Sequence, residues 1–436
     1  MNTWSPDSWL NYPYEQAARY ANPHHLTRVV QKLSALPPLV IPEEVEQLKN
    51  AIARAGRGEA FILQGGDCAE SFQACREDII GNKLKILLQM SLVLLHGLQK
   101  PIIRIGRIAG QYTKPRSFAV ESHHGITLPS YRGDLINAPA FNSKAREPKP
   151  ELLLQGYSTA AMTLNFIRAL LNSEFSNLHH PHQWDLDFFK HSKQADEYHA
   201  MVANMANTME TLQAINDVNF FTSHEALHLH YEQALTRQIG QEKHWYDLST
   251  HLPWLGMRTT AVDSAHVEFL RGIKNPIGIK IGPRATSAWL KTILERLNPT
   301  REEGRMLLIT RLGADNVSKS LPSLIQAVQA IDMPVTWSCD PMHGNTETTS
   351  NNIKTRHFDT MLLELKRTLT LHKEHNTHLG GVHFELTGEN VTECIGGARG
   401  LTAHDLKIAY HSLVDPRLNY EQSMEMAFQL SRAFKT

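Results

Sequence analysis

Short runs of β-branched and aromatic residues alternate along most of the chain with longer amphipathic stretches. The short runs end in polar residues and predict strands, whereas apolar positions three and four residues apart predict helices. The predicted strands are residues 61–63, 102–105, 219–222, 245–249, 277–281, 306–310, 335–338 and 382–386. The predicted helices are residues 42–55, 78–98, 224–239, 261–273, 287–297, 320–331, 358–372 and 420–433. Eight strand–helix alternations predict an α/β fold, a parallel (β/α)8 barrel of the TIM type.

Two segments depart from this rhythm. Residues 1–60 are rich in tryptophan, tyrosine and proline but have too few apolar positions for a core of their own. We expect them to form an N-terminal arm packed on the barrel. About 115 residues separate the second and third strands, and helical patterns at 156–171 and 185–215 predict an inserted helical segment within residues 118–218. Residues 1–436 are therefore expected to form a single barrel domain with two additions.

The amino-acid composition argues against some classes of function. Lysines and arginines number 44, as do aspartates and glutamates, so the net charge is zero. This balance argues against nucleic acid or an anionic membrane as partner, because either would favour a net basic surface. Neither a secretory leader pattern nor a run of 18 apolar residues is present, and the four cysteines form no CxxC pair. We therefore expect a cytoplasmic protein with reduced thiols.

Four residues of metal-ligand type follow predicted strands, where a barrel of this kind places its active site. They are Cys68, His343, Glu385 and Asp415. A thiolate, an imidazole and two carboxylates suit a borderline divalent ion such as Mn²⁺, Co²⁺, Fe²⁺ or Zn²⁺ better than Ca²⁺ or Mg²⁺. Spacing alone leaves other interpretations open, since Cys68 fits a buried small residue, Glu385 an ion-pair partner and Asp415 a turn residue.

Cationic residues form a second set at the predicted strand ends. They are Arg107, Lys114, Arg116, Arg258, Lys280 and Arg311. Arginine binds phosphate and carboxylate through paired hydrogen bonds and lysine binds them as a point charge. Each residue alone is equally compatible with an ion pair to a neighbouring carboxylate. Together, in a neutral protein, they predict a small anionic substrate.

Several long strings resemble one enzyme family. QGGDCAESF, RIGRIAGQYTKPRS, LPSYRGDLIN, TSHEALHLHYE, DSAHVEFLRGIKNPIGIKIGP, LITRLGAD, WSCDPMHGNT, HFELTGENVTEC and SLVDPRLN resemble the type II 3-deoxy-D-arabino-heptulosonate 7-phosphate (DAHP) synthases. These enzymes condense phosphoenolpyruvate with erythrose 4-phosphate in the first step of the shikimate pathway, which leads to the aromatic amino acids. The likeness extends over about residues 40–430.

The resemblance implies a role for each member of the two sets. It assigns Cys68, His343, Glu385 and Asp415 to a divalent metal, with Mn²⁺ or Co²⁺ as the first expectation. It assigns Arg258, Lys280 and Arg311 to the phosphate of phosphoenolpyruvate, and Arg107 with Lys280 to its carboxylate. It assigns Lys114, Arg116 and Ser117 to erythrose 4-phosphate, with the catalytic Lys114 near the aldehyde. With Cys68 as the thiol ligand, Cys339 and Asp340 are expected only to shape the turn before His343.

One position departs from the family pattern. Met257 stands in Gly256-Met257-Arg258-Thr259, where the family usually has glutamate. If the backbone N–H binds phosphate, Met257 serves unchanged as a substrate-binding residue. If the missing carboxylate orients Arg258 or a substrate hydroxyl, the affinity or the range of substrates shifts, which leaves the identity of the aldehyde partner open. A related metal-dependent synthase that joins phosphoenolpyruvate to another aldose is therefore the alternative, as is the same reaction in secondary metabolism.

The resemblance also bears on regulation and assembly. The arm and the inserted helices are similar to accessory elements through which longer family members bind aromatic amino acids and associate. We expect a homo-oligomer, a dimer or a tetramer, with an aromatic amino acid as effector, although plain packing would explain the same segments. A sensor or scaffold without catalysis would need a broken ligand set, and all four ligand types are present.

Overall fold

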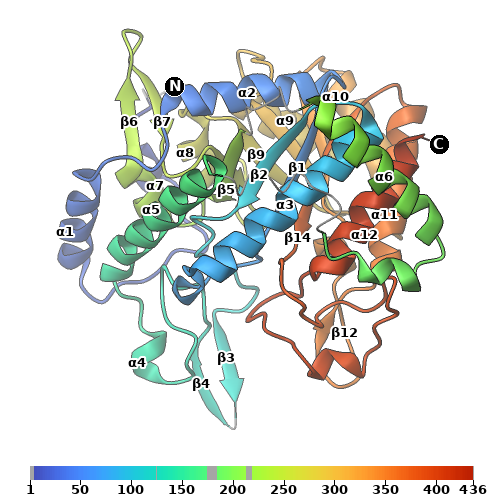
Figure 1. Cartoon of the computed structure of the whole chain (residues 1–436). Coiled ribbons are helices and arrows are strands. Elements are labelled where there is room, and N and C mark those ends of the chain that lie inside the picture. The colour runs from blue at the N-terminus through green and yellow to red at the C-terminus, as the bar shows by residue number, and fades with distance from the viewer. Residues whose placement is uncertain (1–3, 124, 174–183, 213–218, 436) are drawn as a thin grey trace.

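The computed structural model describes residues 4–123, 125–173, 184–212 and 219–435, and its centre is a closed barrel of eight parallel strands (Figure 1). The strands follow one another around the barrel in chain order, and the last closes against the first. They are β1 (Phe61–Gly66), β2 (Ile102–Arg107), β5 (Phe220–Glu225), β8 (Leu252–Leu255), β9 (Ile277–Ile281), β10 (Met306–Thr310), β11 (Thr336–Cys339) and β14 (Leu379–Glu385). The predicted barrel is confirmed.

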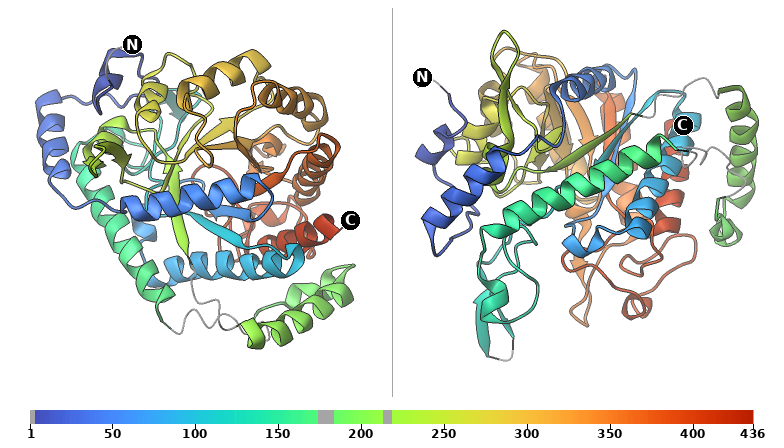
Figure 2. Two further views of the ribbon diagram at one scale, coloured as in Figure 1. Left: turned by 90° about the horizontal axis from the view of Figure 1, so that it is seen from above. Right: turned by 60° about the vertical axis from the view of Figure 1, so that its left-hand side comes forward.

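Each barrel strand is followed by a helix on the outside of the barrel (Figure 2). These helices are α3 (Glu77–Leu98), α5 (Glu151–Leu171), α7 (Leu229–Leu235), α8 (Ala265–Arg271), α9 (Ser287–Leu297), α10 (Val317–Gln329), α11 (Phe358–Glu374) and α12 (Tyr420–Lys435). Ser264 and Thr286 begin α8 and α9 by accepting hydrogen bonds from backbone N–H groups of the first turn. Within the described residues, α3 alone has the length and apolar composition of a membrane span, and 67% of its most apolar window is buried inside the protein.

The fourth predicted strand is wrong. Residues 244–247 form β7 (His244–Asp247), which pairs antiparallel with β6 (Thr236–Ile239) outside the barrel. The barrel strand is the next segment, β8, whose Pro253 is unfavourable in a central strand by sequence rules. The predicted helix 224–239 is also too long, because β5 continues to Glu225 and β6 begins directly after α7. Burial between neighbouring strands overrides local propensity here.

The N-terminal residues close one end of the barrel. Before β1 lie the 3-10 helix η1 (Ser8–Asn11), α1 (Pro23–Ser34) and α2 (Pro42–Gly56). Helix α2 crosses the end at which the strands begin (Figures 1 and 2). Its Leu48, Ile52 and Ala55 are fully buried in one cluster with apolar side chains from the barrel interior. Because this end is sealed by apolar packing, the carboxyl ends of the strands form the open end.

Additional elements flank α5 between β2 and β5. Before α5 come the β3–β4 hairpin (Val120–His123 and Ile126–Pro129) and α4 (Ser143–Arg146), which project from the open end (Figure 1). After it come the 3-10 helix η5 (Asp187–His191) and α6 (Ala195–Leu212), which lie outside α12. The ring of Tyr198 stacks on Phe428 of α12 with centroids 4.8 Å apart. The end of the predicted helix 185–215 lies outside the described residues.

Smaller elements complete the loops. They are the 3-10 helices η2 (Phe72–Ala74), η6 (His343–Asn345) and η7 (Asp405–Lys407), and a short hairpin of β12 (Glu347–Thr348) and β13 (Lys354–Thr355). The β12–β13 hairpin follows β11 and lies at the open end beside the loop that precedes α12. Thus the β3–β4 hairpin, the β12–β13 hairpin and the loop between β14 and α12 surround the carboxyl ends of the barrel strands.

Candidate active site

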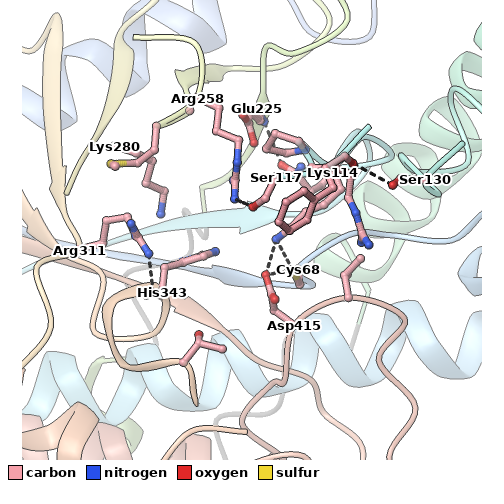
Figure 3. Close-up of a pocket in the computed structure, with 18 of the residues that line it drawn as sticks. Cys68, Lys114, Ser117, Ser130, Glu225, Arg258, Lys280, Arg311, His343 and Asp415 are labelled. Carbon is pink, nitrogen blue, oxygen red and sulfur yellow. Dashed lines mark hydrogen bonds and ion pairs between the residues drawn. The ribbon is translucent and has the colours of Figure 1, made fainter. Parts of the chain in front are cut away.

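A cavity of about 830 Å³ opens at the carboxyl ends of the barrel strands. Its walls carry all but one of the residues expected at the site, since Glu385 lies buried just beneath it. Arg258, Lys280 and Arg311 point into the cavity from one side, and Lys114 extends from the other towards Cys68 and Asp415 (Figure 3). The barrel topology therefore brings together side chains that are far apart in the sequence.

Three acidic or thiol groups converge at the floor of this cavity. The ligand atoms of Cys68, Glu385 and Asp415 all lie within 4.8 Å of one another. Glu385 is the last residue of β14, and Cys68 follows the end of β1 by two residues. At the end of β1, Gly66 has φ +145°, and a Cβ there would lie 2.5 Å from the carbonyl oxygen of Arg107. This glycine therefore lets the two strand ends approach each other below the site.

The ammonium of Lys114 already stands between two of these groups. Its Nζ lies 2.7 Å from Cys68 Sγ, 2.7 Å from Asp415 Oδ2 and 4.0 Å from Glu385 Oε1. Burial alone lowers the pKa of Lys114, but the negative charge of Asp415, together with that of Glu385, outweighs it and raises the pKa above its ordinary value. The donor group thus attracts a cation.

The thiol needs such a cation before it can ionise. Burial, with the neighbouring charge of Glu385, raises the pKa of Cys68. The single charge of the Lys114 ammonium does not offset this rise, so a thiolate forms here only when a larger positive charge compensates it. The donor set and its position therefore fit a divalent metal ion, which would replace the ammonium of Lys114 between the thiol and the carboxylates.

Glu385 is fully buried, and its carboxylate faces three basic side chains. Its Oε1 lies 3.0 Å from His343 Nε2 and 3.2 Å from Arg107 Nη2, and its Oε2 lies 2.7 Å from Arg356 Nη1. Burial alone raises the pKa of Glu385, but the positive charges of His343 and Arg356 hold it well below its usual range. His343 thus joins the donor group from the Glu385 side.

A different carboxylate supports His343 from behind. Asp340 follows β11 directly, and its Oδ2 lies 2.7 Å from His343 Nδ1 and 2.5 Å from Lys280 Nζ. Burial alone raises the pKa of Asp340, but the charges of His343 and Lys280 hold it well below its usual range. Burial also lowers the pKa of Lys280 to about 8, although Asp340 opposes this change. Lys280 is therefore a cation only up to mildly alkaline pH.

The cations on the Lys280 side form a positively charged surface of the cavity, made up of Arg258, Lys280 and Arg311. Arg311 donates to the carbonyl oxygen of His343 at 2.5 Å, and Arg258 donates to Ser117 Oγ at 2.6 Å. The side chain of Met257 lies over Gly282, where an added Cβ would meet its Sδ and Cε at 2.5 Å. A methionine therefore lies beside the positively charged surface, in the wall of the same cavity.

A smaller polar surface lies at the mouth of the cavity. Arg116 lines it, with Nη2 3.4 Å from Glu121 Oε2, and Ser117 is exposed. The hydrogen bond from Arg258 to Ser117 joins this surface to the positively charged surface. Arg107 is buried below both, where Nη1 lies 2.8 Å from His383 Nε2 and Nη2 donates to the carbonyl oxygen of Cys68 at 3.0 Å. Every site residue expected from the sequence is thus in or directly under one cavity.

The whole chain was also compared with known proteins. The model of the class-II DAHP synthetase family matches residues 4–431.

The chain belongs to the class-II DAHP synthetase family.

Curated relatives agree with this membership. The chain is 44% identical to phospho-2-dehydro-3-deoxyheptonate aldolase of Neurospora crassa, over 99% of this chain and 94% of the relative. It is 43% identical to the Streptomyces coelicolor protein of the same name, over 98% and 97% of the two chains. It is 41% identical to phospho-2-dehydro-3-deoxyheptonate aldolase AroG of Mycolicibacterium smegmatis, over 92% and 89%.

Four lining or supporting residues of this class-II DAHP synthetase were not expected from the sequence. Glu225, the last residue of β5, is only 7% exposed, and its Oε1 has no hydrogen-bond partner among the described residues. Trp254 lies with its ring centroid 5.3 Å from the guanidinium carbon of Arg107. Lys354 reaches Asp415 Oδ1 at 3.0 Å from the β12–β13 hairpin, and Arg356 lies under Glu385. Glu225 was assigned to a helix, Trp254 belongs to the missed strand β8, and nothing in local spacing indicates the other two.

Proposed function

We propose that this member of the class-II DAHP synthetase family condenses phosphoenolpyruvate with erythrose 4-phosphate and water. The products are 3-deoxy-D-arabino-heptulosonate 7-phosphate and phosphate, and the reaction is the first step of the shikimate pathway towards aromatic amino acids. The proposal is carried by one observation: two cationic surfaces flank a Cys–His–Glu–Asp donor group in a single cavity. Two anionic substrates fit on either side of one electrophilic centre.

On one side, Arg258, Lys280 and Arg311 would bind the phosphate of phosphoenolpyruvate, with the backbone N–H of Met257 beside them. Arg107 and Lys280 would bind its carboxylate. Arg107 is held in place by His383 and Glu385, so its orientation is set before substrate arrives. Fixing both anionic groups places C3 of the enol phosphate for attack, and such positioning supplies several kcal/mol of the barrier.

On the other side, Arg116 and Ser117 would bind the phosphate of erythrose 4-phosphate, and the aldehyde would lie near Lys114. When C3 attacks the aldehyde carbon, the aldehyde oxygen gains negative charge and needs a proton. Lys114 would donate it as general acid, because an ammonium group carries a proton at neutral pH and its Nζ lies beside the donor group. Water then adds at C2, and phosphate leaves from the resulting tetrahedral intermediate.

We further propose that Cys68, His343, Glu385 and Asp415 hold a divalent ion, Mn²⁺ or Co²⁺ in the first place and otherwise Fe²⁺ or Zn²⁺. The mixed soft and hard ligands favour these ions. Such an ion acts as a Lewis acid that stabilises negative charge developing on a carbonyl oxygen. The chain's own contribution is to keep the thiol, the imidazole and the two carboxylates within reach of one another.

The test is an assay of purified protein stripped with a chelator. Phosphoenolpyruvate consumption is followed by its ultraviolet absorbance, and the product is identified by mass spectrometry. We expect consumption only when erythrose 4-phosphate and a divalent ion are both added. Full turnover without any metal would refute the metal centre, whereas metal-dependent turnover with another aldose alone would refute the proposed substrate.

That second outcome corresponds to the alternative function, a related synthase with a different aldose. Met257 is the observation that favours it, because it places a thioether in the cavity wall beside Arg258. A panel of phosphorylated and unphosphorylated aldoses separates the two. Equal kcat/KM for erythrose 4-phosphate and an unphosphorylated aldose would leave Arg116 and Ser117 without their proposed role. The same reaction in secondary metabolism would give the same result in this assay.

For the whole chain we propose one barrel domain with an arm at residues 1–60 and an insertion within 118–218, acting in the cytoplasm as a homodimer or tetramer. Exposed apolar side chains near the β3–β4 hairpin, including Phe118 at 78% exposure, support association. An aromatic amino acid is the proposed effector. Light scattering tests the oligomer, and the assay repeated with each aromatic amino acid tests the effector.

A further inference from the structure

The carboxylate of Asp340 contacts both a proposed metal ligand, His343, and a residue proposed to bind phosphoenolpyruvate, Lys280. It follows the end of β11 and its side chain is fully buried. Oδ1 accepts hydrogen bonds from the backbone N–H groups of Met342 at 3.0 Å and His343 at 3.2 Å. Oδ2 contacts His343 Nδ1 at 2.7 Å and Lys280 Nζ at 2.5 Å. Both oxygens are therefore held in fixed directions.

The contact between Asp340 and His343 occupies one of the two ring nitrogens of the histidine. An ionised carboxylate only accepts hydrogen bonds, so the proton of His343 must lie on Nδ1. On the other side of the ring, Nε2 lies 3.0 Å from Oε1 of Glu385, and it would bind a cation only after giving up the proton of this contact. Supports of this kind orient histidine ligands and raise their basicity. Asp340 thus occupies Nδ1 and leaves Nε2, which faces Glu385 of the donor group, as the nitrogen that can bind a metal ion.

The contact with Lys280 uses the same oxygen. Lys280 lies in β9 and is almost fully buried. Its Nζ has Oδ2 of Asp340 as its one hydrogen-bonded partner among the described residues, and it lies 5.9 Å from the ring centroid of Trp254. Two donors therefore share one acceptor atom, and a stronger bond to one of them weakens the hold on the other.

We propose that Asp340 is a positioning residue that couples metal binding to phosphoenolpyruvate binding. This inference rests on the function proposed above. When Nε2 of His343 binds a cation, its Nδ1–H becomes a stronger donor, and Oδ2 of Asp340 is drawn towards the ring. Lys280 is then less tightly held and its ammonium can turn to the substrate anion. By thermodynamic reciprocity, phosphoenolpyruvate that draws Lys280 away must tighten metal binding by the same factor.

The experiment measures binding, not turnover. Calorimetric titration gives the Kd of Mn²⁺ without and with saturating phosphoenolpyruvate, for the wild-type chain and Asp340→Asn. We expect phosphoenolpyruvate to tighten Mn²⁺ binding at least about fivefold in the wild type. In Asp340→Asn, Mn²⁺ binding should weaken about 10- to 100-fold, and most of the fivefold coupling should disappear. Wild-type coupling in Asp340→Asn would overturn the inference.

A matched control separates this effect from the loss of any buried carboxylate. Glu268 of α8 is 2% exposed and holds two cations, with contacts of 2.5 Å to Arg271 and 3.3 Å to Arg296, away from the cavity. Glu268→Gln should keep both the Mn²⁺ affinity and the coupling. If it loses the coupling as Asp340→Asn does, the loss reflects general destabilisation, and the inference fails.

A second pair of variants keeps the inference testable if Asp340→Asn does not fold. Lys280→Met leaves Oδ2 of Asp340 to His343 alone, whereas Arg311→Met removes a clamp cation that does not contact Asp340. We expect Mn²⁺ to bind more tightly to Lys280→Met than to Arg311→Met, and equal affinities would refute a shared acceptor. If the wild type binds neither Mn²⁺ nor phosphoenolpyruvate, the proposed function fails, independently of Asp340.

Discussion

The pH dependence of phosphoenolpyruvate binding follows from the burial of Lys280. Its pKa is lowered from 10.5 to about 8, so about nine tenths of the ammonium groups are charged at pH 7 and about one tenth at pH 9. If the charged form is needed to bind the substrate anion, kcat/KM for phosphoenolpyruvate falls about tenfold over this interval. This alkaline limb of the pH profile should be seen in kcat/KM, because kcat/KM reports the pKa values of the free enzyme.

The lowered pKa of Lys280 also affects the stability of the folded chain, which changes with pH in the direction opposite to substrate binding. The folded pKa of Lys280 lies below the unfolded value, so between about pH 8 and 10.5 the unfolded chain binds more protons than the folded chain. Stability therefore rises with pH across this window, while substrate affinity falls. At neutral pH the buried ammonium costs about 3 kcal/mol of folding free energy, taking about 1.4 kcal/mol for each pKa unit. A buried ammonium that destabilises the fold is consistent with a residue whose role is to bind an anionic ligand.

The assay is kcat/KM for phosphoenolpyruvate from about pH 6 to 9.5 at saturating metal and aldose, for the wild type and Lys280→Arg. An arginine stays charged throughout this range, so the variant should lose the alkaline limb even if its activity is lower overall. A flat wild-type profile up to pH 9.5 would refute the reasoning. So would an alkaline limb that persists unchanged in Lys280→Arg, because the titrating group would then be another residue.

Four further substitutions give separate tests, three in the site and one outside it. Cys68→Ala removes the thiol donor and should abolish metal-dependent turnover and weaken Mn²⁺ binding in calorimetry; unaltered affinity would exclude Cys68 as ligand. Arg311→Ala should raise the KM for phosphoenolpyruvate about 10- to 100-fold, as expected for a lost hydrogen bond to a charged group, and an unchanged KM would remove Arg311 from the clamp. Gly256→Ala places a Cβ 1.8 Å from Glu225 Oε1 and should lower both kcat/KM and Tm. Gly81→Ala, in open space on α3, should instead add up to about 1 kcal/mol of stability in denaturant unfolding.

Hydrophobic periodicity was enough to predict the barrel, because strands such as β1, β9, β10 and β14 are largely apolar runs that are buried on both faces. It failed at β8, since Pro253 weakened the local pattern and the more strand-like β7 lies next to it in the chain. The choice between them depends on β5 and β9, which pair with β8 along the barrel wall. Such a choice is made by tertiary contacts, and no window of sequence contains them.

The sequence by itself determined the alternation of elements, the neutral charge, the residue types at the strand ends and, through its motifs, the family. It could not determine that Lys114 stands between Cys68 and Asp415, that Glu225 faces the cavity, or that one oxygen of Asp340 serves two donors. These facts depend on distances of a few ångströms between residues up to about 350 positions apart. Only closure of the barrel brings those residues together, and burial then sets which of them carry charge.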